Sequence, residues 1–99
     1  MSNTKPGTAQ AKQFIKNDRT IVTGWRFKQR GDNTGWHRHI HDYVIVPLTD
    51  GVVKIDLGGG EFTSATMQKG VPYFRERGVE HDVISDNDFE FAFMEIEII

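Results

Sequence analysis

Histidine is the residue type whose spacing suggests chemistry in this chain, since three of its four histidines lie within five residues: His37, His39 and His41. Residues two apart on a β-strand point to the same side, which would bring the rings of His37 and His39 close together. Imidazole is a common ligand for divalent transition metals, so this pair could supply half of a metal site. The remaining histidine, His81, is then the candidate for a third ligand.

Other interpretations of these histidines stay open. A surface strand could carry the same pair with both rings bonded only to water. His41 has the same parity as His39, and it could be a further metal ligand, a hydrogen-bond partner of a ligand, or a surface residue.

A histidine pair needs strands to hold it, and the rest of the sequence predicts them. Short stretches rich in β-branched and aromatic residues alternate with turns that contain Gly, Asp and Asn. No stretch of ten or more residues has a clear helical period. The expected strands are 20–27, 36–48, 52–57, 61–67, 71–74, 81–84 and 89–99. Many short strands between Gly-rich turns indicate an all-β sandwich or barrel.

The last of these segments carries two carboxylates whose direction is left open. Its alternation puts Glu95 and Glu97 on the same face as Phe91 and Phe93. Either the carboxylates reach solvent at a sheet edge, or one of them lines a cavity. The aromatic residues expected in the core are Trp25, Phe27, Phe62, Tyr73, Phe74, Phe89, Phe91 and Phe93.

Length and composition narrow the classes of protein. The 99 residues fit one domain, and 12 basic and 14 acidic side chains give a net charge of −2. Nucleic-acid binding would need a clustered basic surface, and a membrane span would need a long apolar run; the sequence has neither. The polar N-terminus also lacks the apolar segment of a signal peptide, so we expect a cytoplasmic protein.

Residues 1–13 are polar and include Pro6 and Gly7, so we expect a flexible arm ahead of a domain at 14–99. The chain has no cysteine, so a disulfide cannot stabilise so small a core. A bound metal or a second subunit can. Because a small barrel leaves strand edges that another chain can cover, we expect a homodimer.

The histidines lie in a pattern that resembles the first motif of the cupin family. That motif is a glycine, five residues, H-x-H, three or four residues, a glutamate or glutamine, six residues and a glycine. Gly31, His37, His39, Tyr43 and Gly51 follow it closely, with seven residues before the last glycine.

A second cupin motif is P-x-G, two residues, a histidine, three residues and an asparagine. Glu76, Gly78, His81 and Ser85 follow it, with Glu76 in the place of the proline and Ser85 in that of the asparagine. The resemblance covers about residues 20–98. It is similar in detail to very small bacterial cupins, some of which are labelled for β-alanine degradation.

The resemblance implies a double-stranded β-helix, or jelly-roll, barrel in which His37, His39 and His81 hold one divalent transition metal ion. Tyr43 stands where the family has a carboxylate ligand, and a neutral tyrosine binds metals poorly, so we expect three protein ligands with Tyr43 as a possible fourth. Fe, Mn, Ni, Cu and Zn all accept imidazole. The uncompensated charge of the ion favours an anionic small-molecule ligand.

Similar small cupins with three histidines include iron-dependent dioxygenases, which suggests activation of O₂ on a carboxylate or diketone substrate. Tyr43 would then donate a hydrogen bond to a bound oxygen species, and Arg26 or Arg75 would hold an anionic group, unless both arginines are surface residues. The alternative is a non-catalytic protein that binds a small ligand as a carrier or sensor. A barrel that serves only as a dimerisation scaffold is a third interpretation.

Overall fold

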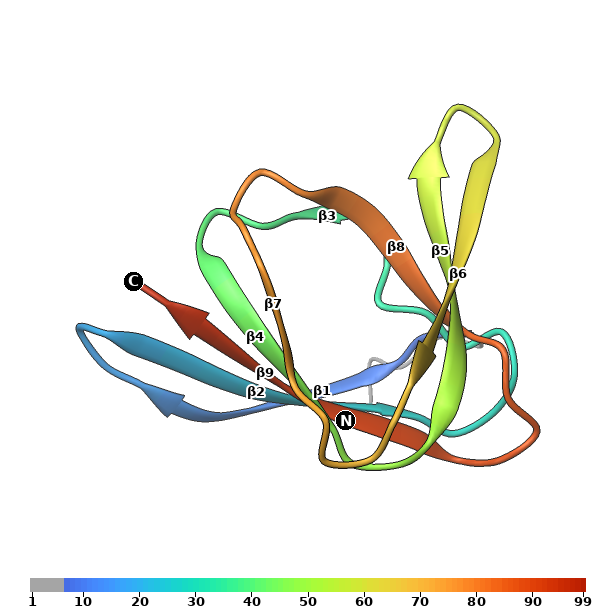
Figure 1. Ribbon diagram of the computed structural model, residues 1–99, viewed down its shortest axis with the longest axis horizontal. Helices are drawn as coiled ribbons and strands as arrows, with labels where there is room; N and C mark the ends of the chain where they lie inside the picture. The colour runs from blue at the N-terminus through green and yellow to red at the C-terminus, as the bar shows by residue number, and fades with distance from the viewer. Residues whose placement is uncertain (1–6) are drawn as a thin grey trace.

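The computed structural model describes residues 7–99, and these residues form an all-β structure, as expected. Two antiparallel sheets face each other as the walls of a small barrel (Figure 1). The strands are β1 (Gln10–Lys16), β2 (Thr20–Phe27), β3 (His37–Arg38), β4 (Asp42–Pro47), β5 (Gly51–Gly58), β6 (Glu61–Met67), β7 (Tyr73–Arg75), β8 (Glu80–Ser85) and β9 (Phe91–Ile98). The five-stranded sheet has the order β1-β2-β9-β4-β7, and the four-stranded sheet has the order β3-β8-β5-β6. Within residues 7–99, no helix could cross a membrane.

The segment expected as one strand over 36–48 is divided in two. β3 ends at Arg38 and β4 begins at Asp42. Between them the His39 N–H donates to the carbonyl of Val79 (2.8 Å), and the His39 carbonyl accepts from the N–H of Gly78 (2.7 Å). The break lets one segment contribute to both sheets, since β3 lies in the four-stranded sheet and β4 in the five-stranded one.

β1 extends into the segment expected to be a flexible arm. It starts at Gln10 and pairs with β2, so residues 10–13 belong to the sheet. The composition suggested a flexible arm because this segment is mostly polar. Every residue of β1 is exposed, and exposed positions are often polar even in a regular strand. Residues 1–6 of the expected arm lie outside the described residues.

The core lies between the sheets, where aromatic rings of β2 and β9 pack together. Phe27, Phe91 and Phe93 are at most 3% exposed. The ring centre of Phe27 lies 5.8 Å from that of Phe91 and 5.6 Å from that of Phe93. Val53 of β5 is fully buried against them from the opposite sheet. The sheets approach so closely here that a Cβ atom on Gly51 would come within 2.5 Å of the Phe91 ring.

Three aromatic residues expected in the core lie on the surface instead. Phe62, Phe74 and Phe89 are 49%, 50% and 51% exposed. Phe62 occupies an outward position of β6 beside Lys54, whose ammonium lies 4.3 Å from the centre of the ring. Phe89 precedes β9 in a turn, because the strand begins only at Phe91. Aromatic residue type alone therefore did not identify the buried face.

Candidate metal centre

Two strands of the four-stranded sheet bring His37 and His81 together. β3 and β8 are antiparallel, with His37 directly opposite His81, and opposed residues have Cβ atoms only about 5 Å apart. His39 follows one residue after β3, where its backbone hydrogen bonds to Val79 and Gly78 hold it beside the pair. All three histidines line a cavity between the two sheets.

The three rings converge through the same atom, Nε2. Nε2 of His39 lies 3.0 Å from Nε2 of His37 and 3.1 Å from Nε2 of His81. The ligand atoms that the three residues offer all lie within 4.8 Å of one another. His39 and His81 are only 5% and 8% exposed, so the nitrogens meet away from bulk water.

Burial also determines the protonation state of His39 and His81. Burial first, and the neighbouring His37 second, lower the pKa of His39 and of His81 from 6.5 to about 4. Both rings are therefore neutral at neutral pH, which is the form that binds a metal. One proton on Nε2 of His39 can satisfy only one of its two short contacts. A cation between the three nitrogens would remove the remaining repulsion between lone pairs.

The distances between the nitrogens fit a divalent metal. Ligand nitrogens at about 2.1 Å from an ion, with about 90° between them, are about 3.0 Å from one another, in agreement with the observed 3.0 and 3.1 Å. His37 presents Nε2 to the site because its Nδ1–H donates to the carbonyl of Gly35 (2.8 Å). Such a bond fixes the tautomer and the ring orientation of a ligating histidine.

The histidines open onto a cavity of about 360 Å³. Apolar side chains from both sheets, among them Ile45, Val53 and Phe93, form part of its wall. The five-stranded sheet supplies the phenol, guanidinium and carboxyl groups of the wall: Tyr43 of β4, Tyr73 and Arg75 of β7, and Glu95 of β9. The opposite side adds hydroxyl groups to the histidines, among them Thr34, whose Oγ1 lies 3.2 Å from Nδ1 of His37. Titratable groups other than the histidines therefore come from one wall.

Tyr43 packs against the face of His39. Their ring centres lie 3.8 Å apart with an interplanar angle of 16°, and Tyr43 is only 3% exposed. Burial, reinforced by Tyr73 and Glu95, raises the pKa of the Tyr43 phenol to about 12. Tyr43 is thus a neutral hydrogen-bond donor, and its stacking fixes the orientation of the His39 ring.

Glu95 lines the cavity, which resolves the direction that the sequence left open. Its side chain is 12% exposed, and its Oε2 lies 3.9 Å from Nδ1 of His39. Burial first, and the negative charge of Glu97 second, raise the pKa of the Glu95 carboxyl from 4.5 to about 7. The sequence indicated this direction, because Glu95 lies two residues after Phe93 on the same strand face and Phe93 is only 3% exposed.

The two candidate arginines lie on opposite faces of the five-stranded sheet. Arg75 lines the cavity, with its guanidinium 4.5 Å from the centre of the Tyr73 ring. Arg26 alternates with two inward aromatic residues of β2 and points outward, where its Nε lies 3.9 Å from the carboxylate of Glu90. Among the described residues, the cluster of possible metal ligands comprises the three converging histidines, and His41 is outside it.

Comparison with known proteins agrees with this architecture, although no family model matches the chain. It is 48% identical to the β-alanine degradation protein BauB of Pseudomonas aeruginosa over 84 residues, which cover 85% of this chain and 86% of that protein. It also matches the crystal structure of a cupin domain from Bordetella pertussis, with a TM-score of 0.88 and 43% identity over 98% of this chain and 99% of that one. This chain is a cupin.

The cupin fold extends to structures whose sequences have diverged further. An RmlC-like cupin from Methanocaldococcus jannaschii, described as a double-stranded β-helix, matches with a TM-score of 0.73 at 12% identity, over 93% of this chain and 81% of that one. At that identity the likeness concerns the fold alone. The barrel expected from the two motifs is therefore confirmed.

The cavity of this cupin combines a possible metal site with a guanidinium and a carboxyl group in its wall. Three neutral nitrogens would leave the charge of a divalent ion uncompensated and some of its coordination positions free. Arg75 adds a second positive charge in the cavity wall, in a side chain suited to carboxylates. The Glu95 carboxyl, with its pKa near 7, can gain or lose a proton at neutral pH.

Proposed function

We propose that this cupin binds one divalent transition metal ion through His37, His39 and His81, and that it oxidises a small carboxylate bound beside the ion. The convergence of three Nε2 atoms at 3.0 and 3.1 Å on a cavity wall carries this proposal. The name of the Pseudomonas relative, a β-alanine degradation protein, supports a role in catabolism. A chain without cysteine is compatible with a reducing cytoplasm, where we place the protein.

The bound metal would supply a Lewis acid and, if it is redox-active, a centre for dioxygenase chemistry in which both atoms of O₂ enter the product. The residues of the chain would bind and orient the substrate. Arg75 would hold its carboxylate, and the neutral phenol of Tyr43 would donate a hydrogen bond into the site. Glu95 would take up or release a proton, since its pKa is close to neutral. The apolar part of the cavity wall would limit the entry of water.

The metal is tested first, by anaerobic titration of chelator-treated protein with Fe(II), Mn(II), Ni(II), Cu(II) and Zn(II) in a calorimeter. We expect one ion per chain for at least one of these metals, with a micromolar or lower dissociation constant. If none of the five binds in that range, the proposal of a metal centre is wrong.

The carboxylate is tested next on the metal-loaded protein. A lost charge-assisted hydrogen bond is worth about 1.5–3 kcal/mol, so Arg75→Gln should weaken binding of small carboxylates by about tenfold or more without changing metal affinity. Arg26→Gln is the matched control, because it removes the same group from the opposite face of the same sheet, and it should change neither affinity. Equal losses in both variants would contradict a role for Arg75.

Oxygen consumption then tests the reaction, with a panel of small carboxylates, β-alanine and diketones supplied to each metal-loaded form. Uptake of O₂ with at least one pair of metal and substrate is expected. Carboxylate binding without uptake for any pair would mean that the dioxygenase proposal is wrong, and that the cupin is a non-catalytic ligand-binding or sensor protein.

A further inference from the structure

Two oxygen atoms face Nδ1 of His37, the ring nitrogen that does not meet the other histidines. The carbonyl oxygen of Gly35 lies 2.8 Å from this nitrogen, and Oγ1 of Thr34 lies 3.2 Å from it. A carbonyl oxygen can only accept a hydrogen bond, so the bond to Gly35 requires a proton on Nδ1. Nε2 of the neutral ring then carries a lone pair, and this is the atom that a metal ion would bind.

The hydroxyl of Thr34 can either support or oppose this arrangement. It has one proton to donate and two lone pairs that accept. If it donated its proton to His37, Nδ1 would have to be unprotonated, and the ring proton on Nε2 would block a metal ion. If the hydroxyl donates elsewhere, it can only accept from the ring. The other partners of Thr34 therefore decide which tautomer of His37 it favours.

Asp82 of β8 is the partner that draws the hydroxyl proton away from the ring. Its Oδ1 lies 3.4 Å from Oγ1 of Thr34, and a carboxylate oxygen can only accept. The carbonyl of Gly35, 3.0 Å from the same hydroxyl, is a further acceptor. The N–H of Val83 donates to the hydroxyl oxygen at 3.2 Å and occupies one of its lone pairs. The other lone pair is left for the Nδ1–H of His37.

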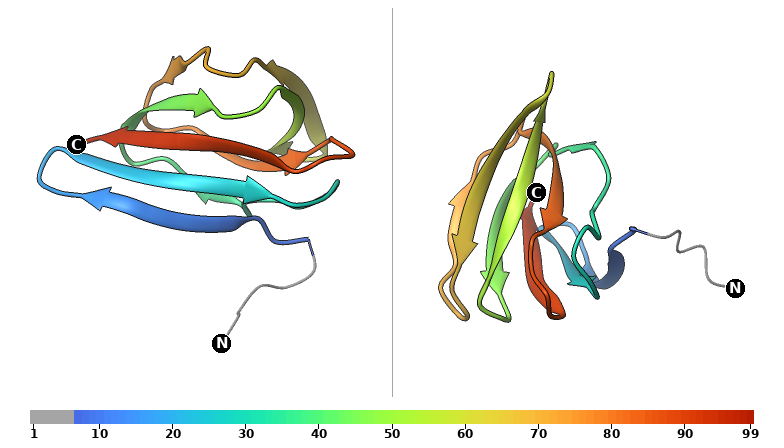
Figure 2. Two further views of the ribbon diagram at one scale, coloured as in Figure 1. Left: turned by 90° about the horizontal axis from the view of Figure 1, so that it is seen from below. Right: turned by 90° about the vertical axis from the view of Figure 1, so that its right-hand side faces the viewer.

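The same carboxylate oxygen also holds the peptide group of Gly35. The N–H of Gly35 lies 3.1 Å from Oδ1 of Asp82 and is shared with Oδ1 of Asn33, also at 3.1 Å. The φ of Gly35 is +82°, a conformation that glycine adopts without a steric penalty. Figure 2 (right) shows the segment between β2 and β3, in teal, alongside β8, in orange. Asp82 therefore contacts both groups that face Nδ1 of His37.

His37 depends on such contacts more than the other two histidines of the cluster. His39 and His81 are 5% and 8% exposed, and the His39 ring is stacked on Tyr43, so packing restrains them. His37 is only half-buried, on a strand of two residues. A ring with less packing around it needs hydrogen bonds to fix its tautomer and its orientation.

We infer that Asp82 is a positioning residue for His37: through the Thr34 hydroxyl and the Gly35 peptide group, it keeps the ring proton on Nδ1 and leaves Nε2 free for a metal ion. Asp82 acts from outside the site, since it is not among the residues that line the cavity. The inference rests on the proposed function only in taking His37 as a metal ligand, because the tautomer can be measured without metal.

Asp56 provides a matched control. It lies directly opposite Asp82 on the neighbouring strand β5, so the loss of either residue removes one carboxylate from the same part of the sheet. The Oδ1 of Asp56 accepts from the N–H of Gly58 at 2.9 Å, within its own hairpin. An effect of charge alone would therefore appear in both Asp82→Ala and Asp56→Ala, whereas an effect on the groups around His37 would appear in Asp82→Ala alone.

Nitrogen-15 NMR of the metal-free, full-length chain at pH 8 tests the tautomer, because long-range proton–nitrogen correlations distinguish protonated from unprotonated ring nitrogens. In the wild type and in Asp56→Ala, the ring proton of His37 should be on Nδ1. In Asp82→Ala, part of the protein should carry this proton on Nε2, enough to shift the resonances of both ring nitrogens, because the Thr34 hydroxyl is then free to donate to the ring. An unchanged His37 tautomer in Asp82→Ala would overturn the inference.

Metal affinity is the second measurement, by calorimetric titration with whichever of the five ions the wild type binds most tightly. Loss of a hydrogen-bond partner behind a ligating histidine lowers metal affinity by about 10- to 100-fold. Asp82→Ala should fall in this range, and Asp56→Ala should stay within about threefold of the wild type. Equal losses of metal affinity in the two variants would contradict the inference.

Thr34 tests the same contact if Asp82→Ala does not fold. Thr34→Val removes the hydroxyl at nearly constant shape, and Thr34→Ser keeps it. Thr34→Val should lose metal affinity by about tenfold, and Thr34→Ser should restore the wild-type value; equal affinities in the two would contradict the role of the hydroxyl. A wild type that binds none of the ions would refute the proposed metal centre, and the NMR spectra alone would then decide whether Asp82 positions His37.

Discussion

The outward faces of the two sheets differ in polarity. On the four-stranded sheet, Lys54, Asp56 and Glu80 alternate with inward residues such as Val53 and His81, as expected for a sheet with one face in water. On the five-stranded sheet the corresponding outward positions of β4 and β9 are apolar, apart from Asp42 opposite Ile98. The outward face of the five-stranded sheet is therefore the more apolar of the two.

The inward faces of the sheets differ in chemistry. The four-stranded sheet supplies His37 and His81, and a loop at its edge supplies His39. The five-stranded sheet supplies the phenols of Tyr43 and Tyr73, together with the nearby guanidinium and carboxyl groups. If metal binding belongs to one wall and ligand binding to the other, substitutions in the two walls should have separable effects.

Substitutions in the two walls should differ most in their effect on metal affinity, and loss of a histidine should have the largest effect. His81→Ala removes one of three candidate ligands, and we expect metal affinity to fall at least about 100-fold, or about 3 kcal/mol. Tyr73→Phe, in the opposite wall, should leave metal affinity within about threefold. Calorimetric titration of both variants checks this. A comparable loss of metal affinity in Tyr73→Phe would contradict the assignment of metal binding to the histidines alone.

Titratable groups in the two walls should change the stability of the metal-free protein in opposite directions as the pH changes. His39 and His81 have a pKa of about 4 when folded, against 6.5 as the model value, so their contribution to stability is complete above pH 6.5 and falls as the pH drops toward 4. Glu95 has a pKa of about 7 when folded, against 4.5, so its contribution is complete below pH 4.5 and is lost as the pH rises through 7.

Urea denaturation of the wild type and of Glu95→Gln at several pH values separates these contributions. Relative to the wild type, Glu95→Gln should gain about 2 kcal/mol of unfolding free energy between pH 5 and pH 8, because only the wild type has to ionise a buried carboxyl. Both proteins should still lose stability below pH 6.5 through the histidines. Parallel pH profiles above pH 5 would show that Glu95 does not titrate as described.

Substitutions at two glycines test how tightly the core and the outward face of the five-stranded sheet are packed. Gly51→Ala would place a Cβ atom 2.5 Å from the fully buried ring of Phe91, which cannot move without disturbing the core. Overpacking of this kind costs about 1–3 kcal/mol, and we expect about 2 kcal/mol by chemical denaturation. A loss below about 0.5 kcal/mol would show that the core is less tightly packed than the structure indicates.

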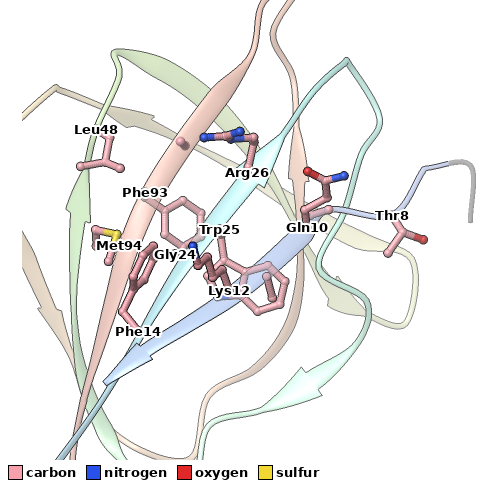
Figure 3. A pocket seen from close by; sticks show the side chains of 13 residues that line it. Thr8, Gln10, Lys12, Phe14, Gly24, Trp25, Arg26, Leu48, Phe93 and Met94 are labelled. Carbon is pink, nitrogen blue, oxygen red and sulfur yellow. The ribbon is translucent and has the colours of Figure 1, made fainter. Parts of the chain in front are cut away.

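Gly24→Ala should have the smallest effect. Its Cβ atom would lie 2.8 Å from the ring of Phe14 (Figure 3), but that ring is 56% exposed at the edge strand and can turn away. We expect less than about 1 kcal/mol of destabilisation by chemical denaturation, close to the range of ordinary surface substitutions. A loss as large as that of Gly51→Ala would show that the Phe14 ring cannot move.

Much of the fold and of the histidine cluster could be predicted because the relevant patterns are local. Alternation along a strand depends on neighbouring residues only, so it indicated most of the strands and placed His37 and His39 on one side. The same rule, applied to β2, could have excluded Arg26 from the cavity, since Arg26 stands between inward Trp25 and Phe27. Composition was less reliable, as the exposed but regular β1 shows.

The sequence by itself determined the all-β class, the family motifs and the three histidines, because each depends on residue type and short-range spacing. Only the tertiary structure decided that Glu95 faces the cavity, that Arg75 lies in its wall, and that β9 lies between β2 and β4. These features depend on which strands become neighbours across the barrel. Strand order is set by contacts between residues far apart in the chain, and no local pattern records it.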